Sequence, residues 1–291
     1  MSVSARRGTI ALEDAEVLEH TAFDGNQFVL RAHAPVTAQR ARPGQFAHIQ
    51  CGVEFSLRRP LSIMRTDPSG WIELLYKPVG AGLTALTHLQ ARQKLSVLGP
   101  IGNGFDWRSE PQRILALGGG VGIPPMIFAA QVLRGGAIPL NVFIGSEVPF
   151  PFELAATSLE TPGIDGNGKS TIALLSDWGI PAILASRSGL AGSHDGFVTQ
   201  LAARTLAALG QQERMRTLVL ACGPQAMLAA TARLAREFDV RCQLALEEYM
   251  ACGVGGCAGC TVAVRTASGT QMQRVCVDGP VFDAEAIYPA A

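Results

Sequence analysis

Residues 247–276 read EEYMACGVGGCAGCTVAVRTASGTQMQRVC, and four cysteines stand in this stretch. They are Cys252, Cys257, Cys260 and Cys276, in the spacing C-x4-C-x2-C-x15-C. Three of the thiols fall in one short loop, whose interspersed glycines allow tight turns that bring backbone amides close to the sulfurs. Thiolates gathered in this way are the ligands of iron–sulfur clusters, so the stretch predicts a metal centre held by these four residues.

The spacing of the four cysteines also bears on the kind of centre. The order C-x4-C-x2-C…C is typical of plant-type ferredoxins and favours a 2Fe–2S cluster. A structural zinc site remains an alternative, although such sites usually take two C-x2-4-C pairs and Cys276 stands alone. Disulfides are the third reading; no apolar signal segment opens the sequence, and they would give the glycines no purpose.

Composition limits the class of protein. The chain has 291 residues, with 24 Lys plus Arg and 24 Asp plus Glu, and this zero net charge argues against nucleic acid as a partner. No run of 18 uncharged apolar residues predicts a membrane span. The chain has 7 cysteines, four of them in the cluster motif, which fits the reducing cytoplasm.

The order of strand and helix patterns predicts a multidomain β plus α/β protein. Residues 1–106 read as short strands separated by turns such as Asp24-Gly25-Asn26, which indicates a small antiparallel β-barrel, with one helix expected at 84–89. Residues 107–240 alternate between strands and helices, as in a Rossmann-like parallel sheet covered on both faces. Within them we expect helices at 123–136, 152–160, 196–209 and 224–238, and strands at 113–120, 139–146, 171–177, 181–186 and 217–224. Residues 241–291 form a small module with a hairpin around Ala267-Ser268-Gly269.

Two glycine-containing turns follow apolar strands of the α/β region. Gly118-Gly119-Gly120-Val121-Gly122 precedes a helix with prolines in its first turn, where backbone amides and the helix dipole suit a pyrophosphate. Taken alone, the run is equally readable as a tight strand-to-helix turn. Cys222-Gly223-Pro224 also joins a strand to a helix, and two such turns on one sheet predict a ligand between them.

The barrel region offers weaker signals. Arg58-Arg59-Pro60-Leu61-Ser62 combines a guanidinium fork and a hydroxyl suited to phosphate, although for this motif alone an ordinary basic surface strand is the better explanation. Gly80-Ala81-Gly82 precedes the expected helix and could hold a further phosphate. The five histidines lack metal-ligand spacing and read as ordinary surface or core residues, and no catalytic acid, base or nucleophile is evident.

Together these motifs resemble one family: the electron-transfer subunit of the two-subunit, NAD-dependent bacterial dihydroorotate dehydrogenase, within the ferredoxin–NADP reductase superfamily. The resemblance extends over nearly the whole chain. It rests on RRPLS at 58–62, LLYKP at 74–78, LGPIGNGF at 98–105, LGGGVGIPPM at 117–126, ACGPQAML at 221–228, DGPVFDAEAI at 278–287 and the cysteine motif.

The resemblance implies an FAD-binding barrel at 1–106, an NAD(P)-binding domain at 107–240 and a 2Fe–2S module at 241–291. It assigns the flavin to the residues Arg59, Pro60, Leu61, Ser62, Leu75, Tyr76, Lys77, Gly82 and Leu83. Leu83 departs from the family, which usually has threonine after this glycine. The nucleotide is assigned to Gly118, Gly119, Gly120, Gly122, Cys222, Gly223 and Pro224.

The choice between NAD and NADP is left open by Ser186-Arg187, which follows the strand at 181–186. NAD-using members tend to carry acidic residues here, whereas a Ser-Arg pair in NADP-using reductases binds the 2′-phosphate. An arginine suits a phosphate dianion and gives nothing specific to a bare ribose diol.

The family's partner is an FMN-containing catalytic subunit that oxidises dihydroorotate in pyrimidine biosynthesis, and we expect a heterotetramer with it. The predicted activity is therefore that of a cytoplasmic NAD(P)-linked oxidoreductase subunit. A reductase (diaphorase) subunit serving a hydrogenase, a ferredoxin or an oxygenase is the first alternative, because a fold does not fix a partner. A non-enzymatic metal-binding module on a degenerate scaffold is the second alternative.

Overall fold

The computed structural model of the protein describes residues 8–165 and 169–290 and shows two compact units. The first unit contains the chain up to Gly104 together with Leu246–Val281, and the second contains Phe105–Ala245 and the residues from Phe282 onward. Among the described residues, no helix is long and apolar enough to cross a membrane. The three-domain division at residues 106 and 240 is a functional assignment and stays a prediction.

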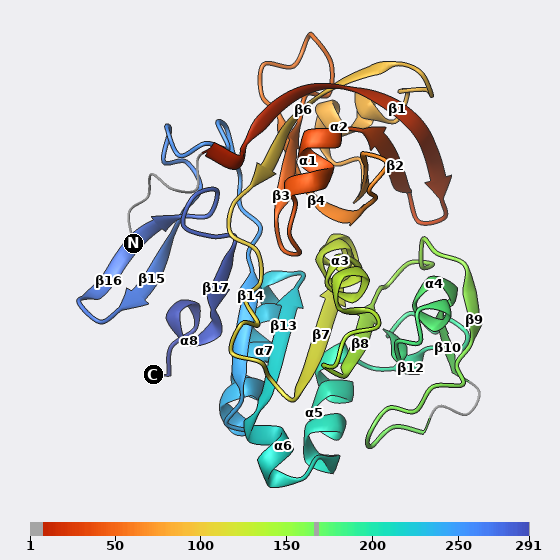
Figure 1. Cartoon of the computed structure of the whole chain (residues 1–291), viewed down its shortest axis with the longest axis vertical. Helices are drawn as coiled ribbons and strands as arrows, with labels where there is room; N and C mark the ends of the chain where they lie inside the picture. The colour runs from red at the N-terminus through yellow and green to blue at the C-terminus, as the bar shows by residue number, and fades with distance from the viewer. Residues whose placement is uncertain (1–7, 166–168, 291) are drawn as a thin grey trace. The chain divides into compact units, whose positions relative to one another are not determined.

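A closed six-stranded antiparallel barrel forms most of the first unit and confirms the predicted architecture (Figure 1). Its strands follow the order β1-β2-β5-β4-β3-β6. They are β1 (Ala11–Phe23), β2 (Gln27–His33), β3 (Phe46–Ile49), β4 (Arg59–Thr66), β5 (Trp71–Tyr76) and β6 (Lys94–Ile101). The predicted turn between β1 and β2 is present, with positive φ at Gly25 and Asn26 (76° and 56°), a conformation that glycine and asparagine tolerate best.

Two short helices accompany the barrel. The sequence did not predict α1 (Pro35–Arg40), which begins at a proline whose fixed φ suits a first helical turn. The helix expected at 84–89 is α2 (Gly80–Leu86), so that prediction was displaced by about one turn. Gly80, with a φ of 72°, and Gly82 thus lie inside the first turn of the helix rather than before it.

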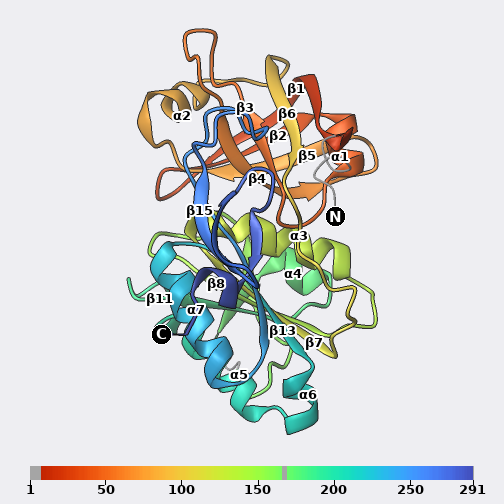
Figure 2. The same ribbon diagram turned by 90° about the vertical axis from the view of Figure 1, so that its left-hand side faces the viewer.

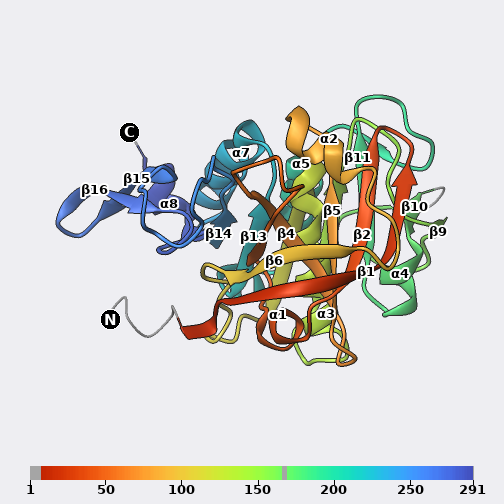
Figure 3. The same cartoon turned by 90° about the horizontal axis from the view of Figure 1, so that it is seen from above.

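The hairpin predicted near residue 268 is formed by β15 (Thr261–Thr266) and β16 (Gly269–Arg274), and it projects away from the barrel strands (Figures 1 and 3). The segment that follows it returns to the barrel exit. Asn103 Nδ2 donates to the carbonyl oxygen of Asp278 at 2.8 Å, and its backbone pairs with Pro280. The two motifs at 98–105 and 278–287 are therefore in direct contact.

The second unit contains a seven-stranded sheet of order β12-β11-β8-β7-β13-β14-β17. The six strands from β12 to β14 in this order pair in parallel. Its strands are β7 (Arg113–Gly119), β8 (Leu140–Gly145), β11 (Ala182–Ser186), β12 (His194–Asp195), β13 (Thr217–Cys222), β14 (Arg241–Ala245) and β17 (Val281–Asp283). The chain starts in the middle of the sheet and builds outward in both directions. This doubly wound topology reverses between β7 and β13, which is where such sheets bind ligands.

Helices cover both faces of the sheet. α3 (Ile123–Leu133) follows β7, whereas α5 (Val198–Ala208) and α7 (Gln225–Glu237) flank β13 in the sequence and pack on each other. Right-handed crossovers place α3 on one face and α5 with α7 on the other; α7 lies along β13 and β14 (Figure 2). The unit also contains the 3-10 turn Gly120–Gly122, α6 (Gln211–Met215) and α8 (Ala284–Ile287).

Two predictions between residues 150 and 180 were wrong. The helix expected at 152–160 is instead the short strand β9 (Leu154–Ala156), which pairs with β10 (Ser170–Ile172). The strand expected at 171–177 ends at Ile172 and continues as α4 (Ala173–Asp177). Leu175 is the one buried residue of α4. A helix this short, with a single inward-facing side chain, shows no hydrophobic period that would distinguish it from a strand.

Candidate functional site

The four cysteines are positioned by the hairpin and by the glycine-rich loop that precedes it. The ladder from Thr261–Arg274 to Thr266–Gly269 brings the hairpin ends together, and Val275 N–H donates to the carbonyl of Cys260 at 2.9 Å. Cys260 and Cys276 both lie just beyond the Thr261–Arg274 end of this ladder and are consequently neighbours. The loop before the hairpin turns at Gly253 and Gly255, whose φ values are 67° and 80°.

The thiols are close enough to affect one another's ionisation: Cys252 interacts with Cys257, and Cys276 interacts with Cys260 and, more weakly, with Cys252. Partial burial opposes ionisation of Cys252, but the backbone N–H groups of Val254, Cys257 and Gly256 outweigh it and lower the pKa of that thiol to about 6. Burial, followed by the interaction with Cys260, raises the pKa of Cys276 to about 12. Amides directed at a thiolate are the hydrogen bonds that an iron–sulfur ligand receives.

The donor set fits an iron–sulfur cluster. The thiols lie on one loop and the adjoining hairpin, Cys260 and Cys276 are neighbours, and main-chain N–H groups surround Cys252. These thiols and amides are the groups that would hold a 2Fe–2S cluster. Cys257 is exposed, so the tip of the loop is open to a partner.

The two arginines of the barrel motif have different surroundings. Arg58 donates to the carbonyl oxygens of His48 and Ser96 at 3.2 and 3.0 Å, so its guanidinium holds barrel strands together. Arg59 donates only to nearby main-chain carbonyls, and no carboxylate within the described chain pairs with it. Its guanidinium lies 3.4 Å from where a Cβ on Gly82 would stand. The structure thus places Arg59 beside the first turn of α2, in an arrangement that suits a flavin phosphate.

The other predicted flavin residues lie nearby in the barrel. Pro60, Ser62, Lys77 and Leu83 are partly exposed, whereas Leu61 and Leu75 are buried. Tyr76 is 1% exposed, stacks on Phe28 at 5.5 Å, and donates its hydroxyl to His20 Nε2 at 2.9 Å. Its ring is therefore engaged within the protein, and its contact with a flavin stays a prediction.

The two predicted nucleotide turns meet at the topological switch point. Cys222 and Gly118 are paired residues of β13 and β7. A Cβ on Gly122 would overlap the Cys222 carbonyl group, and a Cβ on Gly119 would lie 2.7 Å from Met227 Sδ. Only glycine permits this approach of one backbone to another. Gly120, with a φ of 55°, has open space beside it. The fit to a pyrophosphate rests on this open space beside Gly120, just before the first turn of α3.

Ser186-Arg187, the predicted determinant of nucleotide type, lies at the end of β11 beside a carboxylate that the sequence analysis missed. The carboxylate of Glu147, which follows β8, accepts from Ser188 Oγ at 2.8 Å and from the Arg187 backbone N–H at 3.2 Å. The Arg187 guanidinium is stacked over Phe197, 5.3 Å from the ring centre. Knowing that β8 and β11 are neighbours was necessary to find Glu147.

His48 is the second residue whose environment was not predicted. Its side chain is fully buried, and neither ring nitrogen has a hydrogen-bond partner among the described residues. Burial, together with the charge of Arg58, lowers the pKa of His48 to about 4, although the main-chain groups of Arg58 and Cys252 are near enough to oppose this.

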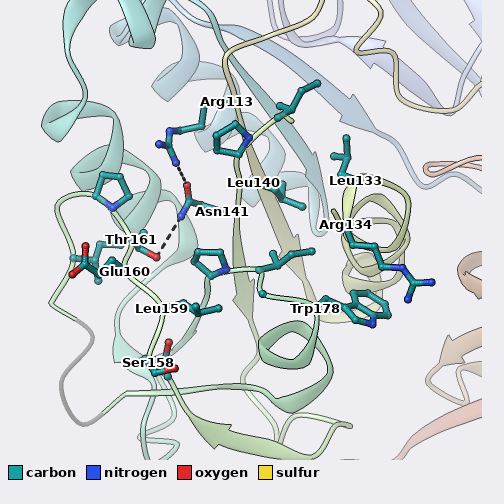
Figure 4. A pocket seen from close by; sticks show the side chains of 18 of the residues that line it. Arg113, Leu133, Arg134, Leu140, Asn141, Ser158, Leu159, Glu160, Thr161 and Trp178 are labelled. Atoms are coloured by element: carbon teal, nitrogen blue, oxygen red, sulfur yellow. Dashed lines mark hydrogen bonds between the residues drawn. The ribbon is translucent and has the colours of Figure 1, made fainter. Parts of the chain in front are cut away.

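A polar pocket in the second unit lies away from the nucleotide turns (Figure 4). Arg113 and Leu140, the first residues of β7 and β8, line it, so it opens at the amino ends of the strands. Arg113 donates to Asn141 Oδ1 at 2.5 Å, and Asn141 Nδ2 donates to Thr161 Oγ1 at 3.4 Å. These bonds fasten Thr161 to the sheet.

A closed barrel and a doubly wound sheet in one chain, with a cysteine-rich loop on the barrel unit, define an iron–sulfur reductase of the ferredoxin–NADP reductase fold. Residues 247–288 match the iron–sulfur cluster binding domain of dihydroorotate dehydrogenase B. The chain belongs to the family of dihydroorotate dehydrogenase B (NAD(+)) electron transfer subunits.

Two relatives show this membership. The chain is 30% identical over 272 residues to the subunit of Desulforamulus reducens, covering 92% of this chain and 95% of the relative. It is 32% identical over 280 residues to that of Geobacillus sp. (strain WCH70), covering 94% and 96%. A chain of the solved NADH-dependent reduced ferredoxin-NADP oxidoreductase, which is described in connection with electron bifurcation, superposes with a TM-score of 0.74 at 25% identity and covers 94% of this chain and 90% of its own.

Proposed function

We propose that the chain passes electrons between a nicotinamide nucleotide and an FMN-containing dihydroorotate dehydrogenase catalytic subunit, with which it forms a heterotetramer, through FAD and a 2Fe–2S cluster. The observation that carries this proposal is the gathering of four cysteines, three in a glycine-rich loop and one after the adjoining hairpin, on the same unit as the barrel. The named relatives are electron transfer subunits of this enzyme. The cysteine content, with four of the seven cysteines in the cluster motif, supports the cytoplasm as its compartment.

Each group is assigned to residues already described. Cys252, Cys257, Cys260 and Cys276 would ligate the cluster, and Arg59 with the first turn of α2 would hold the flavin phosphates. The turns at 118–122 and 222–224 would hold the nucleotide pyrophosphate. When bound, FAD exchanges hydride with the nucleotide, and the cluster carries single electrons. The protein's part is to bind and orient these groups, and the assignment requires no acid or base from the chain.

We further infer that the nucleotide is NAD rather than NADP. The Glu147 carboxylate lies beside the Arg187 backbone and Ser188, where it can accept hydrogen bonds from a ribose diol and repels a 2′-phosphate. Arg187, the residue that would favour NADP, is stacked on Phe197. The relatives are named as NAD(+) proteins, which agrees with this inference.

A reductase serving a different partner is the second candidate. It is favoured by the 25% identity to the NADH-dependent reduced ferredoxin-NADP oxidoreductase, a protein with another electron partner. Co-expression with an FMN-containing dihydroorotate dehydrogenase catalytic subunit separates the two candidates. A stable complex with NADH-linked dihydroorotate oxidation supports the first, and a chain that never binds this subunit eliminates it.

A visible spectrum of anaerobically purified protein tests the cofactors. We expect flavin and cluster absorption that bleach on titration with NADH, and much less with NADPH on a fresh sample. A colourless protein would refute both candidates.

Glu147→Gln tests the inference on nucleotide choice. Removing the charge should improve the NADPH-to-NADH ratio of flavin reduction rates by about tenfold, since one charge-assisted contact is worth roughly 1.5–3 kcal/mol. Glu153→Gln, which neutralises an exposed carboxylate in the same unit, is the matched control. An unchanged ratio in Glu147→Gln would show that this carboxylate does not face the nucleotide.

A further inference from the structure

The imidazole of His48 is an unexplained polar group in the interior of the barrel unit. It is 0% exposed, and both ring nitrogens lack a hydrogen-bond partner among the described residues. Whichever nitrogen carries the proton, the ring has at least one N–H. Burying such a donor without a partner costs about 1–3 kcal/mol, so proteins rarely keep one without a purpose.

The edge of the ring that carries Nδ1 faces the cysteine loop. A Cβ on Gly253 would lie 2.6 Å from His48 Nδ1, and Gly253 is itself buried with a φ of 67°. The main chain of Cys252, the first predicted cluster ligand, also lies close to the ring. Glycine at 253 therefore serves two needs: the left-handed backbone and the close approach of the imidazole.

The same ring also adjoins the flavin side of the barrel. His48 is paired with Pro60 across β3 and β4, and the Arg58 main chain is its other polar neighbour. Arg58 in turn donates to the His48 carbonyl at 3.2 Å. His48 thus lies between the strand that begins with Arg59 and the loop that carries Cys252, all within one unit.

We propose that His48 is a positioning residue for electron transfer, whose ring N–H is the hydrogen-bond donor that the barrel offers to the Cys252–Gly253 segment of the cluster loop. The inference rests on the proposed function, because it assigns the donor to the loop that ligates the cluster. This donor comes from outside the cysteine motif, because His48 lies in β3, about two hundred residues earlier in the chain.

A donor at this place has an effect beyond packing. Reduction adds negative charge to the cluster and its ligands, and hydrogen bonds to that region stabilise the reduced state. Losing the N–H should therefore lower the midpoint potential of the cluster. A side chain that only fills space would leave the potential unchanged when replaced by another of similar size.

The matched variants are His48→Gln and His48→Met, which have similar length and differ in whether they keep an N–H donor. Both are compared with the wild type and with His33→Met, which makes the same change at an exposed position of β2. The measurements are iron and sulfide content, the EPR spectrum of the reduced cluster, and its midpoint potential. FAD content and NADH-dependent flavin reduction are followed in parallel.

We expect His48→Met to show a lower potential and an altered EPR spectrum, or to lose the cluster on purification, while His48→Gln and His33→Met remain close to the wild type. Equal behaviour of His48→Met and His48→Gln, whether unchanged, equally shifted or both without cluster, would overturn the proposal. A wild-type protein without a cluster would instead refute the proposed function, so the two failures are distinguishable.

Discussion

The nucleotide turns of the second unit and the cysteine loop of the first are both rich in glycine, but they are organised in different ways. At the nucleotide turns, glycines allow one backbone to pack directly on another: Gly122 touches the Cys222 carbonyl, and Gly119 faces Met227. In the cysteine loop, Gly256 has open space around it and the residues near Cys257 are exposed. The two turns are held by close packing, whereas the cysteine loop is held by a few hydrogen bonds and, in the proposed function, by its cluster.

Loss of a cluster ligand should have the largest effect and should affect only one side of the comparison. We expect Cys276→Ser to abolish the cluster absorption and electron delivery to the partner, because a 2Fe–2S cluster requires four protein ligands. Flavin reduction by NADH and the unfolding of the second unit should stay near wild-type values. Absorption spectra, iron analysis and stopped-flow reduction are the measurements, with Cys242→Ser, at a buried cysteine of β14, as the control for cluster content.

A Cβ at the packed turn should have the next largest effect. Gly122→Ala places a methyl group into the Cys222 carbonyl, and such overpacking costs about 3 kcal/mol in the free energy of unfolding. We expect a weakened affinity for NADH with an intact cluster spectrum. Gly210→Ala, at a glycine with a φ of −60° and open space beside it, is the matched control. Wild-type stability of Gly122→Ala would show that the turn is not packed as described.

Much of the fold on which these two tests depend could be predicted from the sequence. The barrel and the parallel sheet were predicted because most of their strands are apolar and separated by clear turns, and the hairpin because Ala267-Ser268-Gly269 marks its turn. The glycine run and Cys222-Gly223-Pro224 were expected to share a site, and the structure brings them together. The elements β9, β10 and α4 were predicted wrongly because they have three to five residues each, too few to show a hydrophobic period.

The residues that the sequence analysis missed have a common cause. Glu147 lies beside Arg187 because β8 pairs with β11. His48 lies beside the cysteine loop because that loop returns to β3. Neither the order of strands in a sheet nor a contact between distant segments can be predicted from the local hydrophobic pattern. The cysteine spacing was readable because all of its ligands lie within 25 residues, from Cys252 to Cys276.

A smaller effect should follow from weakening the attachment of the cysteine segment to the barrel. Asn103 Nδ2 donates to the Asp278 carbonyl at 2.8 Å, just beyond Cys276. Asn103→Ala leaves this partly buried carbonyl without its donor, at a cost of about 1–2 kcal/mol. We expect faster cluster loss under chelator, measured by the decay of its absorption, and unchanged stability of the second unit. A decay rate equal to that of the wild type would mean that the barrel does not support this end of the loop.

The smallest effect should come from the loop's own side-chain support. Arg274 Nη1 donates to the carbonyl of Gly255 at 3.0 Å, and the Arg274 Nε lies 3.6 Å from the Asp278 carboxylate, in a half-exposed position. Because water can replace part of this interaction, Arg274→Gln should cost about 1 kcal/mol or less, seen as a modest rise in the rate of cluster loss. Arg265→Gln, on the exposed face of the same hairpin, controls for the change in charge. If Arg274→Gln released the cluster as fast as Asn103→Ala, the loop would be held as much by its own side chains as by the barrel, and the contrast with the packed nucleotide turns would narrow.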